Sequence, residues 1–69
     1  MVDVPTYMTP TPKFKVGDKV RKIGGTYEAD GIIVGVAITT RNEVRYVFEF
    51  LNPSGMLHIF NEGQLAYAA

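Results

Sequence analysis

The sequence contains no cysteine, only one histidine, and no surplus of charge of either sign among its 69 residues. Without thiols no disulfide framework can form, and a lone histidine cannot supply a structural zinc site. Seven basic and seven acidic residues cancel, which removes any whole-chain argument for a polyanionic partner. A chain this short buries only about 60% of its unfolded surface, so association between copies is the remaining route to stability.

Long apolar runs are also missing. The longest, GIIVGVAI, is far too short to cross a bilayer, and the N-terminus lacks the positively charged start and apolar stretch of a secretion signal. We therefore expect a soluble, cytoplasmic protein without a membrane partner. The sequence also has no phosphate-binding glycine loop, no Ser/His/Asp set with motif context and no suggestive carboxylate pair, which argues against most hydrolase and nucleotide-hydrolysis chemistry.

The charge that is present is unevenly distributed. Residues 13–22 hold five basic residues and one acid, whereas residues 23–69 hold two arginines against five acids. The resulting basic stripe could follow a nucleic-acid backbone, and it comprises Lys13, Lys15, Lys19 and Arg21. Nearby acids weaken its field, and the aromatic residues do not interleave with it as a stacking platform requires. Nucleic-acid binding therefore stays an alternative and not the leading interpretation.

The chain divides into a predicted flexible tail, residues 1–13, and one domain, residues 14–69. The tail carries three prolines and three threonines and shows neither a strand nor a helix period. Beyond it, short apolar segments alternate with turns; they are KVRKI, IIVGVAI, RYVFEFL, MLHIF and LAYA. The segment NPSG favours a type I turn, and Asn61 can cap a single helical or 3-10 turn. This pattern predicts an all-β, five-stranded, SH3-like barrel.

Two of these segments are apolar on both faces. IIVGVAI reads as a strand covered on both sides, and MLHIF also places large apolar groups on either face. A small barrel buries only one face of each strand, and burial of one such side chain contributes roughly 1.5–3 kcal/mol. We therefore expect an outward apolar face that finds a copy of itself.

Strand parity sorts the remaining side chains. Tyr46, Phe48 and Phe50 share one side of RYVFEFL and are predicted to lie in the core. Lys22 shares the parity of Val20 and should lie near the apolar side. It is either an ordinary lysine that extends past the strand end to solvent or a cation that draws anionic ligands into a cavity.

Four stretches in order carry a family likeness: VGDKVRK at 16–22, GIIVG at 31–35, YVFE at 46–49 and GMLHIF at 55–60, with a leucine at Leu65. Their order and spacing resemble those of the type II, plasmid-borne dihydrofolate reductases, whose genes confer trimethoprim resistance. The resemblance implies SH3-like barrels that form a homotetramer around a central pore, which binds the cofactor NADPH together with dihydrofolate.

By this resemblance the family's pore lysine falls on Lys22, and its pore stretch Val-Gln-Ile-Tyr falls on Leu57, His58, Ile59 and Phe60. The expected cofactor-binding residues are accordingly Lys22, Leu57, His58 and Ile59, and the expected catalytic residues are His58, Ile59 and Phe60, with no metal. His58 replaces an amide with a ring that gains charge in mildly acidic solution, and Phe60 keeps an aromatic face without a hydroxyl.

The sequence thus supports two functions. A pore without a general acid can still accelerate hydride transfer by holding two flat reactants in contact, so a weak NADPH-dependent oxidoreductase is the leading interpretation. The alternative is a noncatalytic, SH3-like binding module, of the kind that phages encode, that contacts a protein partner or nucleic acid. Under that alternative, His58 is a partly buried histidine at a barrel surface or subunit contact.

Overall fold

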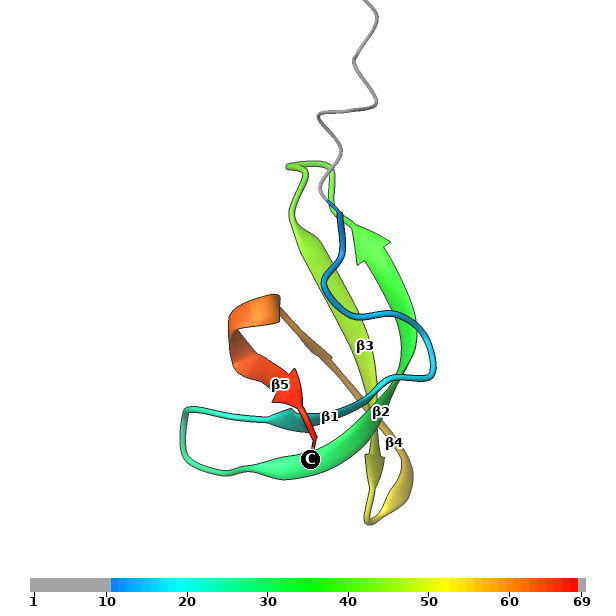
Figure 1. Ribbon diagram of the computed structural model, residues 1–69, viewed down its shortest axis with the longest axis vertical. Helices are drawn as coiled ribbons and strands as arrows, with labels where there is room; N and C mark the ends of the chain where they lie inside the picture. Colours follow the sequence, from blue (N-terminus) through cyan, green and yellow to red (C-terminus); the bar gives the residue numbers. More distant parts are fainter. Residues whose placement is uncertain (1–10, 69) are drawn as a thin grey trace, which may run out of the picture.

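A computed structural model of the protein describes residues 11–68 (Figure 1). Within these residues the chain forms five strands and one 3-10 turn: β1 (Lys19–Lys22), β2 (Ala29–Ile38), β3 (Val44–Leu51), β4 (Ser54–Phe60), η2 (Glu62–Gln64) and β5 (Leu65–Tyr67). The predicted all-β, barrel-like fold is therefore confirmed. Most of the predicted flexible tail, residues 1–10, lies outside the described residues.

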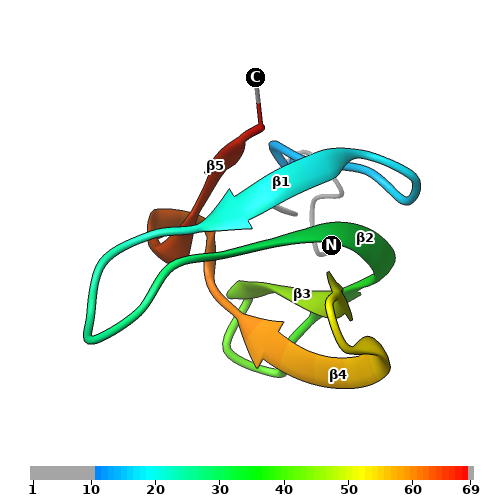
Figure 2. The ribbon, with the colours of Figure 1, turned by 90° about the horizontal axis from the view of Figure 1, so that it is seen from below.

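All five strands belong to one antiparallel sheet with the order β4-β3-β2-β1-β5. The long strands β2 and β3 twist strongly, so the sheet curls around its concave face, and β5 turns back to pair with β1 (Figures 1 and 2). A bulge in β2 between Ile33 and Gly35 adds to this curvature. In the strand order given above, β4 and β5 are the two edges of the sheet.

The concave face carries the core, and strand parity decides which residues reach it. Val20 and Lys22 on β1 are buried while Lys19 and Arg21 are exposed, as predicted. The predicted core residues of β3 are also buried. The complete core comprises Phe14, Val20, Ile33, Tyr46, Phe48, Phe50, Phe60 and Leu65. Phe48 contacts two aromatic rings edge-on, with ring centroids 5.0 Å from Phe50 and 5.3 Å from Phe60, an arrangement that aromatic pairs favour.

The chain joins the barrel at Lys13, one residue before the predicted domain start. The Lys13 amide donates to the Tyr46 hydroxyl at 2.8 Å, and Phe14 packs edge-on between Tyr46 and Tyr67. The Tyr67 hydroxyl donates to the Lys13 carbonyl at 2.8 Å. Two tyrosines from different strands therefore hold the start of the domain in place.

Two local predictions were wrong. The type I turn expected at NPSG is absent because Leu51 pairs with Ser54; the turn is centred on Asn52 and Pro53, which are joined by a cis peptide bond. The expectation that IIVGVAI is covered on both faces also fails within one chain, where Val34 is 40% exposed at the bulge. A single curled sheet has no second layer that could cover its convex face.

Candidate functional site on strand β4

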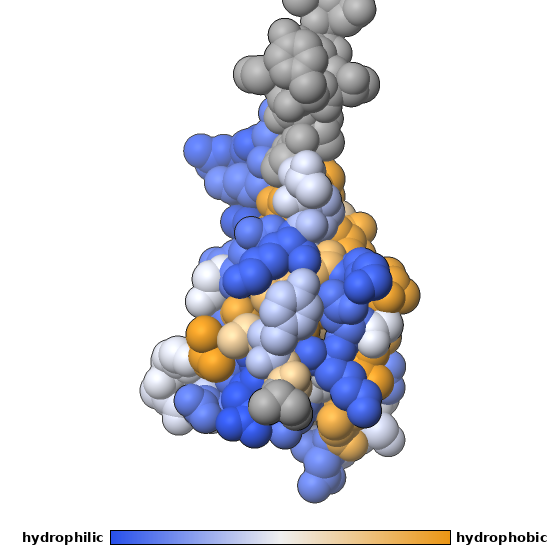
Figure 3. All heavy atoms as spheres, in the orientation of Figure 1, coloured by the Kyte–Doolittle hydropathy of each residue, from blue (hydrophilic) through white to orange (hydrophobic). Residues whose placement is uncertain are grey.

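Strand β4 is the most exposed apolar element among the described residues. Of its seven residues only Phe60 is buried, while Leu57 is 57% and Ile59 60% exposed. Within residues 11–68 the strand is exposed because it pairs only with β3 and has no extensive contact with any other element. Apolar residues also reach the surface on the right-hand side of the molecule in Figure 3. Side chains of this size that remain in water indicate a contact surface.

Leu57 and Ile59 point away from the core, on the convex face of the sheet. Their partners on β3 are Glu49 and Val47, which lie between the buried core positions of that strand. Together Val47, Leu57 and Ile59 form what we call the outer apolar patch. The patch is the outward apolar face that the sequence predicted on MLHIF.

His58 lies on the opposite side of β4, above the core. Its imidazole stacks on the Phe60 ring with centroids 4.6 Å apart and an interplanar angle of 11°. Phe60 is 3% exposed, so one face of the imidazole is covered by a fixed ring while the residue as a whole stays exposed. His58 and Phe60 lie on the same side of β4, as alternate residues of a strand do. The imidazole of His58 is therefore held flat against Phe60, and a planar ligand can stack on this exposed residue.

The buried position of Phe60 changes the role expected of it. The resemblance places this residue in a pore wall, but its ring packs against Phe48 and beneath His58. It has this position because strand parity at the end of β4 turns it toward the concave face. Phe60 thus supports the His58 ring from below and does not itself offer a ligand-binding surface.

Lys22 is separated from β4 by two intervening strands of the sheet and is only 5% exposed. Its ammonium donates to the carbonyl oxygens of Gly24 at 2.6 Å and Tyr27 at 3.1 Å, and it lies 4.1 Å from the centre of the Tyr27 ring. The loop after β1 therefore binds the charge of Lys22. The side chain neither extends to solvent nor faces Leu57, His58 and Ile59.

Consequently, the structure brings together only part of the predicted cofactor site. The exposed ring of His58 fits a planar group such as a nicotinamide, whereas Leu57 and Ile59 lie on the other face of β4. The cation expected to meet the cofactor phosphates, Lys22, is instead held by carbonyl oxygens. The residues present thus fit the ring of NADPH and not its phosphates.

The basic stripe is partly neutralised by acids. Lys15 pairs with Asp18 at 3.1 Å, and Arg21 pairs with Asp30 at 2.8 Å. The hydrogen bond from Arg21 lowers the pKa of the Asp30 carboxyl, and the backbone amide of Lys15 does the same for the pKa of Asp18. Because these carboxylates compete with phosphate for the cations, the stripe gives little support to nucleic-acid binding.

A second polar cluster was not predicted from the sequence. The Tyr46 hydroxyl donates to Glu62 Oε2 at 2.6 Å, and the same oxygen accepts from the Lys13 amide at 3.0 Å. The hydroxyl hydrogen bond lowers the pKa of Glu62, whereas burial and the adjacent carboxylate raise the pKa of Tyr46. No sequence signal reveals this cluster, because its members are separated by 16 to 49 positions.

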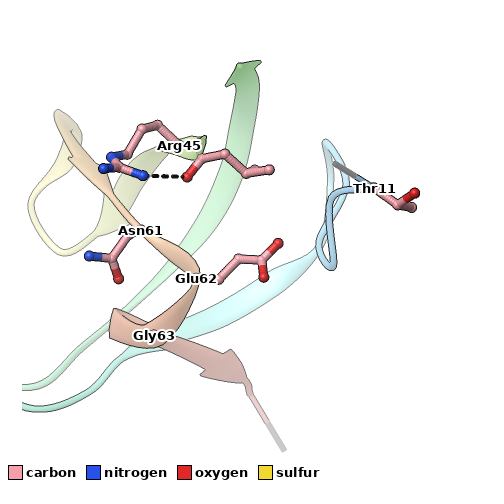
Figure 4. Close-up of a pocket in the computed structure, with 6 residues that line it drawn as sticks. Thr11, Arg45, Asn61, Glu62 and Gly63 are labelled. Carbon is pink, nitrogen blue, oxygen red and sulfur yellow. Dashed lines mark hydrogen bonds between the residues drawn. The ribbon is translucent and has the colours of Figure 1, made fainter. Parts of the chain in front are cut away.

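Beside this cluster lies a pocket of about 320 Å³, lined by Thr11, Val44, Arg45, Asn61, Glu62 and Gly63 (Figure 4). Several of its polar groups already have partners within the chain. The Arg45 guanidinium donates to the Val44 carbonyl at 2.9 Å, and Asn61 Oδ1 accepts from the Gln64 amide at 3.1 Å as the cap of η2. The pocket therefore offers less to a ligand than the exposed surface of β4.

Residues 11–68 contain no cluster of three or more His, Cys, Asp or Glu side chains that could hold a metal ion. Nor does this part of the chain form a helix long and apolar enough to span a membrane. Comparison with known proteins adds no assignment: no protein-family model matches the chain, and no curated protein matches it.

Proposed function

We propose that the protein is a self-associating barrel whose copies meet through β4 and enclose a shared site for flat heteroaromatic ligands, with NADPH and dihydrofolate as the reacting pair. The observation that carries the proposal is the state of β4 in one chain. One face of β4 carries the exposed imidazole of His58, which stacks on Phe60, and the other face carries the exposed outer apolar patch. Association would bury the patch and surround the ring.

Such a site requires no general acid from the protein. NADPH would supply the hydride and solvent the proton for dihydrofolate, and the protein would contribute by holding the two planar rings at contact distance. His58 would offer the polar edge that orients the rings, and Leu57 and Ile59, on the other face of β4, would be buried between the copies. In the family that the sequence resembles, four copies assemble, and we propose the same homotetramer here. Because Lys22 is held by its own loop, we expect weak cofactor affinity and slow turnover.

The assembly is tested by the mass of the particle in solution. Light scattering of the wild-type protein should report a multimer, and Ile59→Lys should dissociate it, since each apolar side chain buried contributes roughly 1.5–3 kcal/mol. Val16→Lys is the matched control, because Val16 is equally exposed, at 62%, but lies outside β4. A wild-type protein that stays monomeric at millimolar concentration would refute the shared site.

The activity is tested by the absorbance of NADPH in the presence of dihydrofolate. Turnover at high protein concentration should be measurable in the wild type and in Val16→Lys. It should fall at least tenfold in His58→Ala, which removes the stacked ring but leaves the core residue Phe60 in place. If the wild-type protein forms a multimer but oxidises NADPH only at the background rate, the reductase function is refuted and the proposed assembly is not.

A noncatalytic binding module is the second candidate, and the sequestration of the Lys22 ammonium favours it. In that case the multimer, or β4 itself, would bind a protein partner without turning over NADPH. Nucleic acid as the partner predicts an affinity that falls steeply with salt, which titration at two salt concentrations would detect.

A further inference from the structure

Strand β4 is an open edge of the sheet. Within residues 11–68 it pairs only with β3, so the backbone groups on its other side have no strand partner. Natural proteins usually protect such an edge with charged residues, proline or a very short strand. The opposite edge, β5, is only three residues long, whereas β4 has seven residues, SGMLHIF, with no charged side chain and no proline. β4 is therefore the edge suited to accept another strand.

The side chains of β4 restrict the strand that can pair with it. An incoming strand must cover large apolar groups at Leu57 and Ile59 without bringing a charge beside them. A second copy of β4 meets both conditions when the two strands run antiparallel about a twofold axis at His58. Leu57 then lies opposite the partner's Ile59, and Ile59 lies opposite the partner's Leu57.

Charge does not oppose this arrangement. The acidic residue nearest along the ladder is Glu49 on β3, which pairs with Leu57, and its carboxylate accepts a hydrogen bond from the Gly55 amide at 3.0 Å. In the paired arrangement both β4 strands separate Glu49 from its copy. Three strand spacings amount to about 14 Å, beyond the screening length of about 8 Å at physiological salt.

We propose that two copies of the chain pair edge to edge through antiparallel β4 strands centred on His58. The proposal rests on the proposed function only in that it requires self-association, and it specifies the contact. Pairing places the two outer apolar patches side by side, so that Leu57 and Ile59 of each copy partly cover those of the other. It also brings two His58 rings to the axis on the same face, so the polar part of the shared site is complete only in the pair.

Cysteine cross-linking of the full chain tests this contact, because the sequence contains no cysteine of its own. Directly opposed residues have Cα atoms about 4.5–5.5 Å apart, within the range of a disulfide. With diamide as oxidant, His58→Cys should form a disulfide-linked dimer in high yield. Val16→Cys, exposed and off the strand, should give only background cross-linking. Circular dichroism of each reduced variant verifies that it is folded.

The register of the two β4 strands, in which Leu57 lies opposite the partner's Ile59, gives a second test. Leu57→Cys and Ile59→Cys should each cross-link poorly alone, but a mixture of the two should yield a mixed dimer. Isotopic labelling of one variant distinguishes this mixed dimer by mass.

The outcomes separate this contact from the proposed function. A multimer in which His58→Cys does not cross-link, or in which Leu57→Cys cross-links best with itself, overturns the proposed pairing while NADPH turnover is unaffected. Efficient His58→Cys cross-linking without wild-type turnover supports the pairing and rejects the reductase. A folded monomer overturns both.

Discussion

Replacing Tyr46 by phenylalanine tests what holds the start of the domain to the barrel. The residue is fully buried, and its hydroxyl accepts from the amides of Lys13 and Phe14 at 2.8 and 3.3 Å while it donates to Glu62 at 2.6 Å. The substitution leaves the ring and its contact with Phe14 in place. Only the hydrogen bonds change.

The expected loss can be estimated bond by bond. A hydrogen bond to a charged group contributes about 1.5–3 kcal/mol, and a neutral one about 1 kcal/mol. The Lys13 amide keeps Glu62 as an acceptor, whereas the Phe14 amide loses the acceptor that it has. The Glu62 carboxylate can regain water because it is not fully buried. Together these effects predict that Tyr46→Phe lowers the free energy of unfolding by about 2–3 kcal/mol.

Denaturant unfolding at one fixed protein concentration measures this loss, because self-association would make stability depend on concentration. Tyr67→Phe is the matched control: its hydroxyl makes a single bond, to the Lys13 carbonyl, from an exposed position, so the loss should be at most about 1 kcal/mol. Equal losses in the two variants, or no loss in Tyr46→Phe, would refute the role assigned to the Tyr46 hydroxyl.

Three further predictions concern stability. The hydrogen bond from the Tyr46 hydroxyl lowers the pKa of Glu62 below its ordinary value of 4.5, so the stability that its carboxylate contributes is present above pH 4.5 and is lost as pH falls through the lowered pKa. The difference in unfolding free energy between wild type and Glu62→Gln should therefore be constant at neutral pH and narrow as pH falls below 4.5, and a difference that stays constant in acid would contradict this. A Cβ at Gly31 would lie 2.5 Å from the Glu49 carbonyl oxygen, so Gly31→Ala should lower the free energy of unfolding by about 3 kcal/mol, as measured with denaturant. Gly63→Ala is the control, because its Cβ would have its nearest neighbour at 3.4 Å, and it should cost under about 1 kcal/mol. Similar losses in the two variants would argue against the close packing at Gly31. Lys22→Met should free the loop at residues 23–28 and speed its proteolysis while the core stays folded, and unchanged cleavage would show that the ammonium does not hold the loop.

Much of the fold could be predicted because period-two alternation sorts residues between two faces without any tertiary information. The burial of Val20 and Lys22 on one side of β1, and of Tyr46 on β3, follows from parity alone. Turn position proved less predictable. The residues NPSG are compatible with more than one hairpin, and the pairing of Leu51 with Ser54 decides between them.

The candidate site was predictable only in part. The sequence identified the apolar surface of MLHIF, since it is a property of one strand. It did not predict that Phe60 would be taken into the core, because parity shows which residues of β4 share a face, whereas the contact with Phe48 on the neighbouring strand shows that this face meets the core. It also left open the partner of the Lys22 charge, which is found in the carbonyl groups of the following loop.

The amino-acid sequence by itself determined the strands, their inward and outward faces, and an excess of apolar side chains over what one small barrel can bury. These properties are local, set by alternation and composition. Only the tertiary structure decided that β4 lies at an edge, that a carbonyl pair binds Lys22, and that Tyr46, Glu62 and Lys13 meet. Such contacts join residues far apart in the chain, and their geometry exists only once the sheet has curled.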